Sequence, residues 1–403
     1  MKSIEVPDTT RDVLDPSACE AIEPSLVKSG NPCVWVYRYS HRPTGWMLSI
    51  ATHGEPGSGK LSLGGFRIAP EHRTSLAGYD NDREAIELAM GMEEKIEWSR
   101  LIGVGGPLLR AHPAALVGGK CVLRPTPDAR VGQPRDVALL DFAIACFEDF
   151  ERVSGVLLAT GQDLGHGLLS DGRTSSLGYV NRRFHGSMLA DTSKPTAEGN
   201  YRVLRGMLRA LDLPLGQARV ALVGCGNIGD HVLMRLREEG ATPVVVEASE
   251  AKRAKVAGQG VEVHAPEEKA AVLASPVDAV VVNASGGSLD PASVALIAAN
   301  PRARVVCGSE NLAMPDPAAA ESLRAAAKAY CPTELGGMMG YLTAVEEYLA
   351  VHSGVPFDLG TLFEAAGKLE EAGFEATTVA RRSGFRKSFE QGVREVYGAA
   401  ERR

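Results

Sequence analysis

The residues whose types and spacing best suit chemistry are three glycines, Gly224, Gly226 and Gly229. An apolar run ends at the first of them and helically spaced apolar residues follow the third, which predicts a strand, a tight turn and a helix. The first glycine permits the turn, the second lets backbone amides reach a pyrophosphate, and the third lets the helix pack close to the strand. The positive end of that helix favours the phosphate charge. We therefore predict a dinucleotide site at Gly224, Cys225, Gly226, Asn227, Ile228 and Gly229.

A carboxylate follows these glycines at the spacing that a ribose contact requires. The next apolar run ends in Glu247, about twenty residues further on, where a carboxylate can accept hydrogen bonds from the adenosine ribose hydroxyls. This favours NAD over NADP as the cofactor. Lys252 and Arg253 follow closely and could hold a 2′-phosphate, so NADP stays open as the alternative. A glycine-rich turn that binds nothing is the other alternative, and the helix and the second strand ending in an acid argue against it.

Length and composition indicate an ordinary globular protein of two domains. The chain has 403 residues, of which 23% are charged and 44% hydrophobic, and its net charge is -7. A negative net charge does not favour binding to nucleic acid. No apolar run is long enough for a membrane span. The seven cysteines show no spacing typical of zinc sites or of a disulfide framework. We expect a cytoplasmic protein with reduced thiols, no metal, and no nucleic acid or membrane partner.

Six further motifs accompany the glycine turn, and their order along the chain is informative. The full series is GGxR at 64–67, GMxxK at 91–95, GGK at 118–120, TxxDxG at 160–165, PTAxG at 195–199, VGxGNxG at 223–229 and GSxN at 308–311. Each motif alone is a weak signal. In this order, from about Leu61 to Leu349, the series resembles the glutamate/leucine/phenylalanine/valine dehydrogenase superfamily, in a motif style closest to the leucine and phenylalanine enzymes.

The resemblance implies an α/β protein of two domains, an N-terminal α/β domain and a Rossmann-type dinucleotide-binding domain, with a catalytic cleft between them. By this resemblance, residues 1–183 form the substrate and catalytic domain, 184–353 form the NAD-binding domain, and the helices of 354–403 return to the first domain. Members of the family oxidatively deaminate L-amino acids with NAD(P), and in reverse they combine a 2-oxo acid with ammonia. The family also implies a homo-oligomer, a dimer or larger.

This reaction requires a base that is neutral near the working pH, because water must attack the iminium that forms when hydride leaves Cα. A lysine meets this need only when burial and a neighbouring cation lower its pKa from about 10.4. The resemblance assigns that role to Lys120, while Lys95 holds the substrate α-carboxylate with the backbone amides near Gly64 and Gly65. Asp163 exchanges protons with the substrate amino group in this scheme.

The resemblance also suggests which residues contact the substrate side chain. Leu63 stands where glutamate-specific relatives have a lysine that pairs with the distal carboxylate. An apolar, aromatic or non-standard amino acid is therefore expected as substrate, and a purely structural Leu63 is the alternative. Met92 and Met338 are expected to line the same pocket, the latter with Met339 and Tyr341 as an adaptable wall.

The remaining cofactor contacts also come from the resemblance. Thr196 is expected near the nicotinamide carboxamide, and Asn311 near the nicotinamide ribose or the substrate. Ala284 is expected to contact the cofactor as well. Threonine and asparagine are also common turn and capping residues, which is the alternative for the first two.

Several departures from the family pattern leave the identity of the substrate open. Between Lys95 and Lys120, the stretch from Gly103 to Pro113 looks inserted and is expected to lie near the site. The element from Tyr330 to Gly337, which helps to wall the pocket, lacks the usual Asn-Ala and is a few residues short. His166 follows the predicted catalytic acid, and we interpret it as a core or surface residue.

Two functions from different classes follow from the sequence. The first is an active amino acid dehydrogenase. The alternative is a protein that keeps the fold and the nucleotide site but serves as a nucleotide-responsive binding or regulatory subunit. The presence of Lys95, Lys120 and Asp163 argues against the alternative.

Overall fold

The computed structural model describes residues 8–28, 33–111 and 115–398, and the chain divides into two compact units. Unit 1 comprises Met1–Ile96, Pro107–Asp191 and Thr343–Phe357. Unit 2 comprises Glu97–Gly106, Thr192–Leu342 and Asp358–Arg403. Among the described residues, no helix is both long and apolar enough to cross a membrane.

Unit 1 is built on a mixed sheet of six strands within the described residues, in the order β1-β2-β3-β5-β4-β6. β4 runs parallel to both of its neighbours, β5 and β6, and the remaining pairs are antiparallel. β5 is buried along nearly its whole length, which explains why its apolar residues do not alternate with polar ones. The strands are β1 (Thr9–Leu14), β2 (Trp35–His41), β3 (Trp46–Thr52), β4 (Leu61–Ile68), β5 (Leu116–Arg124) and β6 (Leu157–Gln162).

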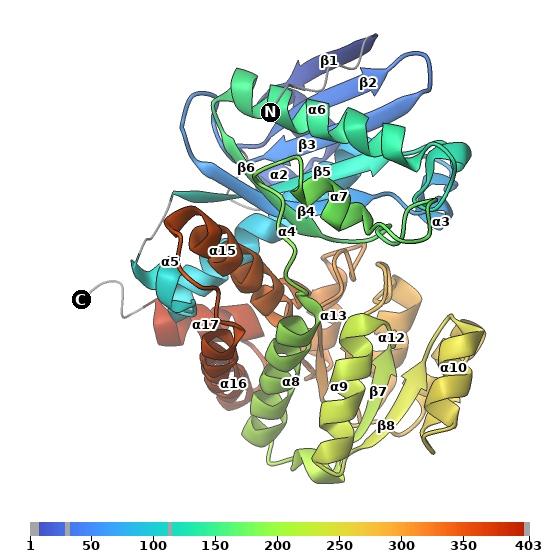
Figure 1. Cartoon of the computed structure of the whole chain (residues 1–403). Helices are drawn as coiled ribbons and strands as arrows, with labels where there is room; N and C mark the ends of the chain where they lie inside the picture. The colour runs from blue at the N-terminus through green and yellow to red at the C-terminus, as the bar shows by residue number, and fades with distance from the viewer. Residues whose placement is uncertain (1–7, 29–32, 112–114, 399–403) are drawn as a thin grey trace. The chain divides into compact units, whose positions relative to one another are not determined.

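The long helix α6 (Asp136–Ser154) covers one face of this sheet (Figure 1). Its Phe142, Phe147 and Phe150 are fully buried in one core with strand residues such as Phe66. The helix ends where Gly155 adopts a left-handed φ of 64°, a conformation that suits glycine. The other helices of this part of the chain are α1 (Pro16–Ile22), α2 (Ser25–Lys28), α3 (Glu71–Thr74), α4 (Asn81–Ile102), α5 (Pro107–Ala111) and α7 (Ser176–Asn181), with a 3₁₀ turn at Pro127–Ala129.

Unit 2 contains a parallel sheet, six strands in the part of the chain that the structure describes, in the order β12-β11-β10-β7-β8-β9. Read from β9, this is the doubly wound order 3-2-1-4-5-6 of dinucleotide-binding folds. The predicted strand, turn and helix are confirmed, because β7 ends at Val223 and α9 begins at Asn227. The strands are β7 (Arg219–Val223), β8 (Thr242–Val246), β9 (Glu262–His264), β10 (Ala279–Val282), β11 (Val305–Gly308) and β12 (Ala329–Tyr330).

Helices flank the parallel strands of unit 2, as Figure 1 shows for α8, α9 and α10. They bury the apolar strands in a core that contains Ala221, Val244, Val280 and Val306. The helices from this point of the chain onward are α8 (Ser193–Ala210), α9 (Asn227–Glu238), α10 (Glu250–Ala257), α11 (Lys269–Ala274), α12 (Pro291–Ala299), α13 (Ala319–Ala325), α14 (Thr333–Gly336), α15 (Met338–Ser353), α16 (Leu359–Arg382) and α17 (Phe389–Tyr397), with 3₁₀ turns at Leu215–Gln217 and Pro266–Glu268.

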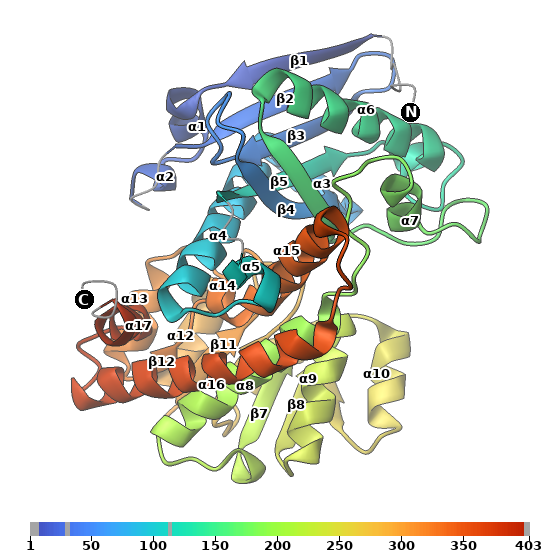
Figure 2. The same ribbon diagram turned by 60° about the vertical axis from the view of Figure 1, so that its left-hand side comes forward.

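The C-terminal helices belong to unit 2, which differs from the sequence expectation that residues 354–403 return to the first domain. α16 runs alongside α8 (Figure 2). Gly206 makes this possible, because a Cβ there would lie 2.1 Å from the carbonyl oxygen of Glu370. The segment of the later chain that belongs to unit 1 is Thr343–Phe357, which includes most of α15.

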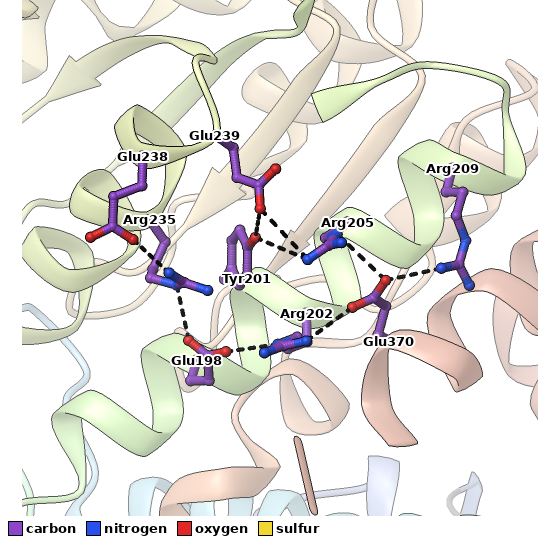
Figure 3. Close-up of polar contacts among 9 residues, drawn as sticks. All are labelled: Glu198, Tyr201, Arg202, Arg205, Arg209, Arg235, Glu238, Glu239 and Glu370. Carbon is purple, nitrogen blue, oxygen red and sulfur yellow. Dashed lines mark hydrogen bonds and ion pairs between the residues drawn. The ribbon is translucent and has the colours of Figure 1, made fainter. Parts of the chain in front are cut away.

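A network of charged side chains joins α8, α9 and α16 in unit 2 (Figure 3). The carboxylate of Glu370, on α16, forms ion pairs with Arg202, Arg205 and Arg209 of α8 at 3.4, 3.5 and 3.0 Å. Glu198 extends the network to α9 by pairing with Arg202 at 2.7 Å and with Arg235 at 3.1 Å. The network therefore joins the helix that carries Thr196 to the helix that follows the glycine turn.

Candidate active site

The predicted catalytic residues come together in unit 1, on three neighbouring parallel strands. Lys120 lies on β5 and Asp163 directly follows β6, and their side chains form an ion pair. Gly65 on β4, the strand between them, lies beside both. A Cβ at Gly65 would be 3.0 Å from the Lys120 Nζ and 3.1 Å from the Asp163 Cβ. The glycine therefore leaves the space in which the lysine and the aspartate meet.

The neighbouring glycines serve close backbone packing. A Cβ at Gly64 would lie 1.8 Å from the carbonyl oxygen of Gly119, a separation that no side chain can occupy. A Cβ at Gly118 would lie 2.4 Å from the backbone nitrogen of Glu93 in α4. The two glycine pairs of the GGxR and GGK motifs thus bring β4, β5 and α4 together around the lysine.

A third charge, which the sequence reasoning did not assign, completes the group. Arg67 on β4 is only 2% exposed and pairs with Asp163 at 3.2 Å and with Glu84 of α4 at 2.7 Å. Glu84 also pairs with Arg73 at 3.1 Å. The available signal in the sequence was an arginine within an otherwise apolar strand, because a buried arginine requires paired carboxylates.

These surroundings lower the pKa values of both Lys120 and Asp163. Burial lowers the pKa of the Lys120 ammonium and the charge of Arg67 lowers it further, against the opposing charge of Asp163. Burial alone would raise the pKa of Asp163, but the charges of Arg67 and Lys120 outweigh it and hold that pKa below its ordinary value. The site thus contains an ionised carboxylate next to a lysine that releases its proton more readily than usual.

The other predicted residues of the substrate side are divided between the units. Leu63, on β4, is 1% exposed. In the sheet it lies opposite Gly118 of β5 and Ala159 of β6. Lys95 is buried on α4, and Met92 of the same helix is half-buried. Met338 is buried at the start of α15 and belongs to unit 2.

His166, interpreted from the sequence as a core or surface residue, is half-buried. Its Nε2 lies 2.7 Å from the Phe66 carbonyl oxygen and its Nδ1 lies 3.0 Å from the Ser176 hydroxyl. Burial lowers the pKa of the ring. Both ring nitrogens therefore have structural partners, and we assign no catalytic step to this residue.

The predicted insertion forms the short helix α5. Its backbone amides at Leu108 and Leu109 donate to the carboxylate of Glu346 in α15, at 3.1 and 2.8 Å. A single glutamate thus anchors the start of this helix within unit 1. The last two residues of the predicted insertion, His112 and Pro113, lie outside the described residues.

The glycine turn in unit 2 has the geometry expected of a phosphate-binding turn. Gly224 adopts a left-handed φ of 88°, and a Cβ at Gly229 would lie 2.1 Å from the Gly224 carbonyl oxygen. At Gly226, the nearest heavy atom to an added Cβ is the Lys252 Nζ at 3.8 Å. The first and third glycines are therefore needed for packing, while the second leaves open space at the start of α9.

Glu247 directly follows β8 and lies beside this turn. It is 8% exposed, and its carboxylate accepts from the backbone amides of Cys225 at 2.7 Å and Ser249 at 2.8 Å. The nearby Arg253 donates to the carbonyl oxygens of Glu247 and Ala248 at 2.9 and 2.7 Å. The acid thus lies against the turn, and Lys252 is the cation closest to its second glycine.

The remaining predicted cofactor residues also belong to unit 2. Ala284 follows β10, and its nitrogen lies 2.7 Å from the position of a Cβ at Gly224. Asn311 follows β11. The hydroxyl of Thr196, near the start of α8, donates to the Thr192 carbonyl oxygen at 2.6 Å. Within the described residues, no cluster of three or more histidine, cysteine, aspartate or glutamate side chains could hold a metal ion.

The strand order of unit 2 and its glycine turn define a dinucleotide-binding α/β fold. No protein-family model matches the chain. Valine dehydrogenase from Streptomyces virginiae is 27% identical over 160 residues, and this match spans 39% of the chain but only 44% of that enzyme. L-tryptophan dehydrogenase from Nostoc punctiforme is a structural neighbour with a TM-score of 0.59 and 16% identity, covering 89% of this chain and 94% of its own.

Glutamate dehydrogenases have similar structures. The hetero-hexameric enzyme from Thermus thermophilus, in its Leu-bound form, has a TM-score of 0.62 and 16% identity, covering 89% of this chain and 82% of its own. The Plasmodium falciparum enzyme has a TM-score of 0.60 and 12% identity, covering 97% and 81%. At these identities the solved structures show a shared fold. The valine dehydrogenase match and this shared fold agree with the resemblance of the ordered motifs to the glutamate/leucine/phenylalanine/valine dehydrogenase superfamily.

Replacing Arg67 by Met tests the buried charge group. At pH 7 the variant should lose about 3 to 5 kcal/mol of unfolding free energy, because two buried carboxylates lose a partner. Asp163 has a lowered pKa when folded, so its stabilisation is present above the ordinary aspartate pKa of about 3.9 and lost as pH falls through the folded value. Denaturant unfolding at several pH values should therefore show the difference shrinking below about pH 4. A difference in unfolding free energy that stays constant with pH would contradict this account. Arg73→Met is the matched control, because it removes only the half-buried arginine that pairs with Glu84.

Proposed function

We propose that the chain is a nicotinamide-dependent L-amino acid dehydrogenase that deaminates an amino acid to a 2-oxo acid and runs the reverse amination. The observation that carries this proposal is the buried Lys120–Asp163 pair with Arg67 beside it. A bound nicotinamide would accept the hydride from the substrate Cα. The glycine turn and Glu247, in the unit with the doubly wound sheet, support such a cofactor.

In this proposal each charged residue of unit 1 has one task. Lys120, with its lowered pKa, takes a proton from the water that attacks the iminium carbon. Asp163 exchanges a proton with the substrate nitrogen, and its ionised form suits an ammonium partner. Lys95 holds the α-carboxylate with backbone amides near Gly64 and Gly65. We also propose that the working protein is a homo-oligomer located in the cytoplasm.

Replacing Lys120 by Ala should abolish turnover and leave NADH binding nearly unchanged, because the lysine lies in unit 1 and the glycine turn in unit 2. Asp163→Asn should behave in the same way. Steady-state kinetics and NADH fluorescence titration measure the two properties separately. General-base catalysis contributes about 10²- to 10⁴-fold, so retention of more than about a tenth of kcat would refute the assignment. Lys60→Ala, at a half-buried lysine next to β4, is the control that should keep its activity.

NAD rather than NADP is the proposed cofactor. A 2′-phosphate would meet the carboxylate of Glu247, and like charges in a partly desolvated site repel strongly. Arg253 is engaged by two backbone carbonyl oxygens, which leaves Lys252 as the nearby cation. We predict a higher kcat/KM with NAD than with NADP. Equal or better kcat/KM with NADP would assign the choice to Lys252, and Lys252→Ala would then reverse it.

The substrate class depends on Leu63. A substrate carboxylate buried against this leucine without a partner would cost several kcal/mol, which predicts at least about a hundredfold lower kcat/KM for glutamate than for leucine, phenylalanine or tryptophan. Relatives named for valine and for tryptophan agree with an apolar substrate. Leu63→Lys should raise the relative rate with glutamate, while Leu63→Met should keep the apolar preference. A preference of the unaltered protein for glutamate would refute this pocket, and activity with none of these substrates would indicate a non-standard amino acid.

A further inference from the structure

Two loops of unit 2 hold each other at the carboxyl ends of neighbouring strands. The first, Asn283–Leu289, follows β10, and the second, Ser309–Ala313, follows β11. Their backbones are joined by hydrogen bonds from Gly287 to the Leu312 carbonyl oxygen at 2.9 Å and from Leu289 to the Ala313 carbonyl oxygen at 2.8 Å. The first loop carries Ala284 and the second carries Asn311, and both residues are among those expected to contact the cofactor.

Glu310 forms the strongest link from the second loop to the first. Its side chain is only 2% exposed, and its two carboxylate oxygens accept from the backbone amides of Ala284 and Ser288, each at 2.9 Å. Hydrogen bonds to a charged acceptor are stronger than those between neutral groups. This residue occupies the variable position of the GSxN motif, to which the catalytic scheme assigns no role.

Asn283 makes the reciprocal link from the first loop to the second. Its Oδ1 accepts from the Ser309 backbone nitrogen at 3.2 Å and from the Ser309 hydroxyl at 2.6 Å. Because a backbone N–H can only donate, the amide oxygen must be the atom that faces Ser309. The same oxygen accepts from the Asn200 amide of α8 at 2.8 Å.

The amide that Glu310 binds lies against the first glycine of the turn. A Cβ at Gly224 would be 2.7 Å from the Ala284 nitrogen and 2.8 Å from its Cα. A shift of Ala284 toward the turn is therefore blocked by the Gly224 backbone, and a shift away from it breaks the bond to Glu310. The carboxylate and the glycine together fix one wall of the expected cofactor site.

We propose that Glu310 is a positioning residue for the nicotinamide cofactor, which holds the loop after β10 in its binding conformation. The inference rests on the proposed function, since it names a residue of the same cofactor site. Gln is the informative replacement, because it preserves shape but sets an NH₂ donor against one of the two amide donors. A residue that merely fills space would tolerate this change.

The experiment compares Glu310→Gln with the unaltered protein in two measurements. NADH fluorescence titration should give a Kd raised about ten- to a hundredfold, the loss expected when a hydrogen bond to a charged group is replaced by an unsatisfied donor. The kcat at saturating cofactor should stay within about threefold. Amide hydrogen exchange without cofactor should be faster at residues 284–289. An unchanged Kd, or unchanged exchange in this loop, would overturn the proposal.

Two further variants separate positioning from general stability. Glu370→Gln alters another buried glutamate of unit 2, which binds arginines rather than loop amides, so it should lower the melting temperature and leave the NADH Kd unchanged. A raised Kd in this control would overturn the specific role of Glu310. If Glu310→Gln does not fold, Ser309→Ala decides the question, because it removes the hydroxyl bond to Asn283 alone. A Kd raised about threefold supports the proposal, and an unchanged Kd contradicts it.

If the unaltered protein binds neither NADH nor NADPH, the proposed function fails. Hydrogen exchange in the loop after β10 still reports whether Glu310 orders that segment, because this measurement needs no cofactor. The two failures are therefore distinguishable.

Discussion

The proposed substrate site depends on a buried ion pair between Lys120 and Asp163, with Arg67 as the second partner of the aspartate. A buried carboxylate with one cationic partner would be left as an unpaired anion when that partner loses its proton, and burial would then favour its protonation. Arg67 retains its charge at all relevant pH values and is itself held by Glu84. Lys120 can therefore change its protonation state while Asp163 remains an anion. This is the condition that an acid–base site needs and that an isolated salt bridge does not meet.

Glycines allow close approach of neighbouring segments in both units. In unit 1, Gly65 leaves room beside the lysine and the aspartate, and Gly64 lets the two strands approach each other closely. In unit 2, Gly224 and Gly229 let the turn and α9 lie against the strands, and Ala284 packs on the first of these. At Gly64, Gly224 and Gly229, backbone atoms of a neighbouring segment lie where another residue would have its Cβ. The same close approach makes the surrounding loops interdependent, because a shift of one backbone meets the next.

The proposed cofactor site uses carboxylates in a different way from the proposed substrate site. Glu247 and Glu310 are both buried and both accept from backbone amides of the segments around the glycine turn. Among the described residues, neither carboxylate has an arginine or lysine as a hydrogen-bond partner. Such acceptors fix loops in place while leaving side chains and open backbone for a ligand. By contrast, the arginine and glutamate network on α8, α9 and α16 joins helices (Figure 3).

The sequence by itself determined what depends on local spacing. The glycine turn and the second strand ending in Glu247 were predictable because hydrophobic periodicity and glycine positions act within a few residues. The resemblance of the ordered motifs to a known superfamily implied the Rossmann-type unit. Only the tertiary structure brought Glu84 and Asp163 to Arg67, Glu310 to Ala284, and α16 to α8. These partners are separated by 17 to more than 90 residues in the first group, by 26 in the second, and by a whole sheet in the third. Charge pairing and close packing at such separations leave no periodic trace in the sequence, because any carboxylate that folding brings near the arginine or the amide would satisfy it.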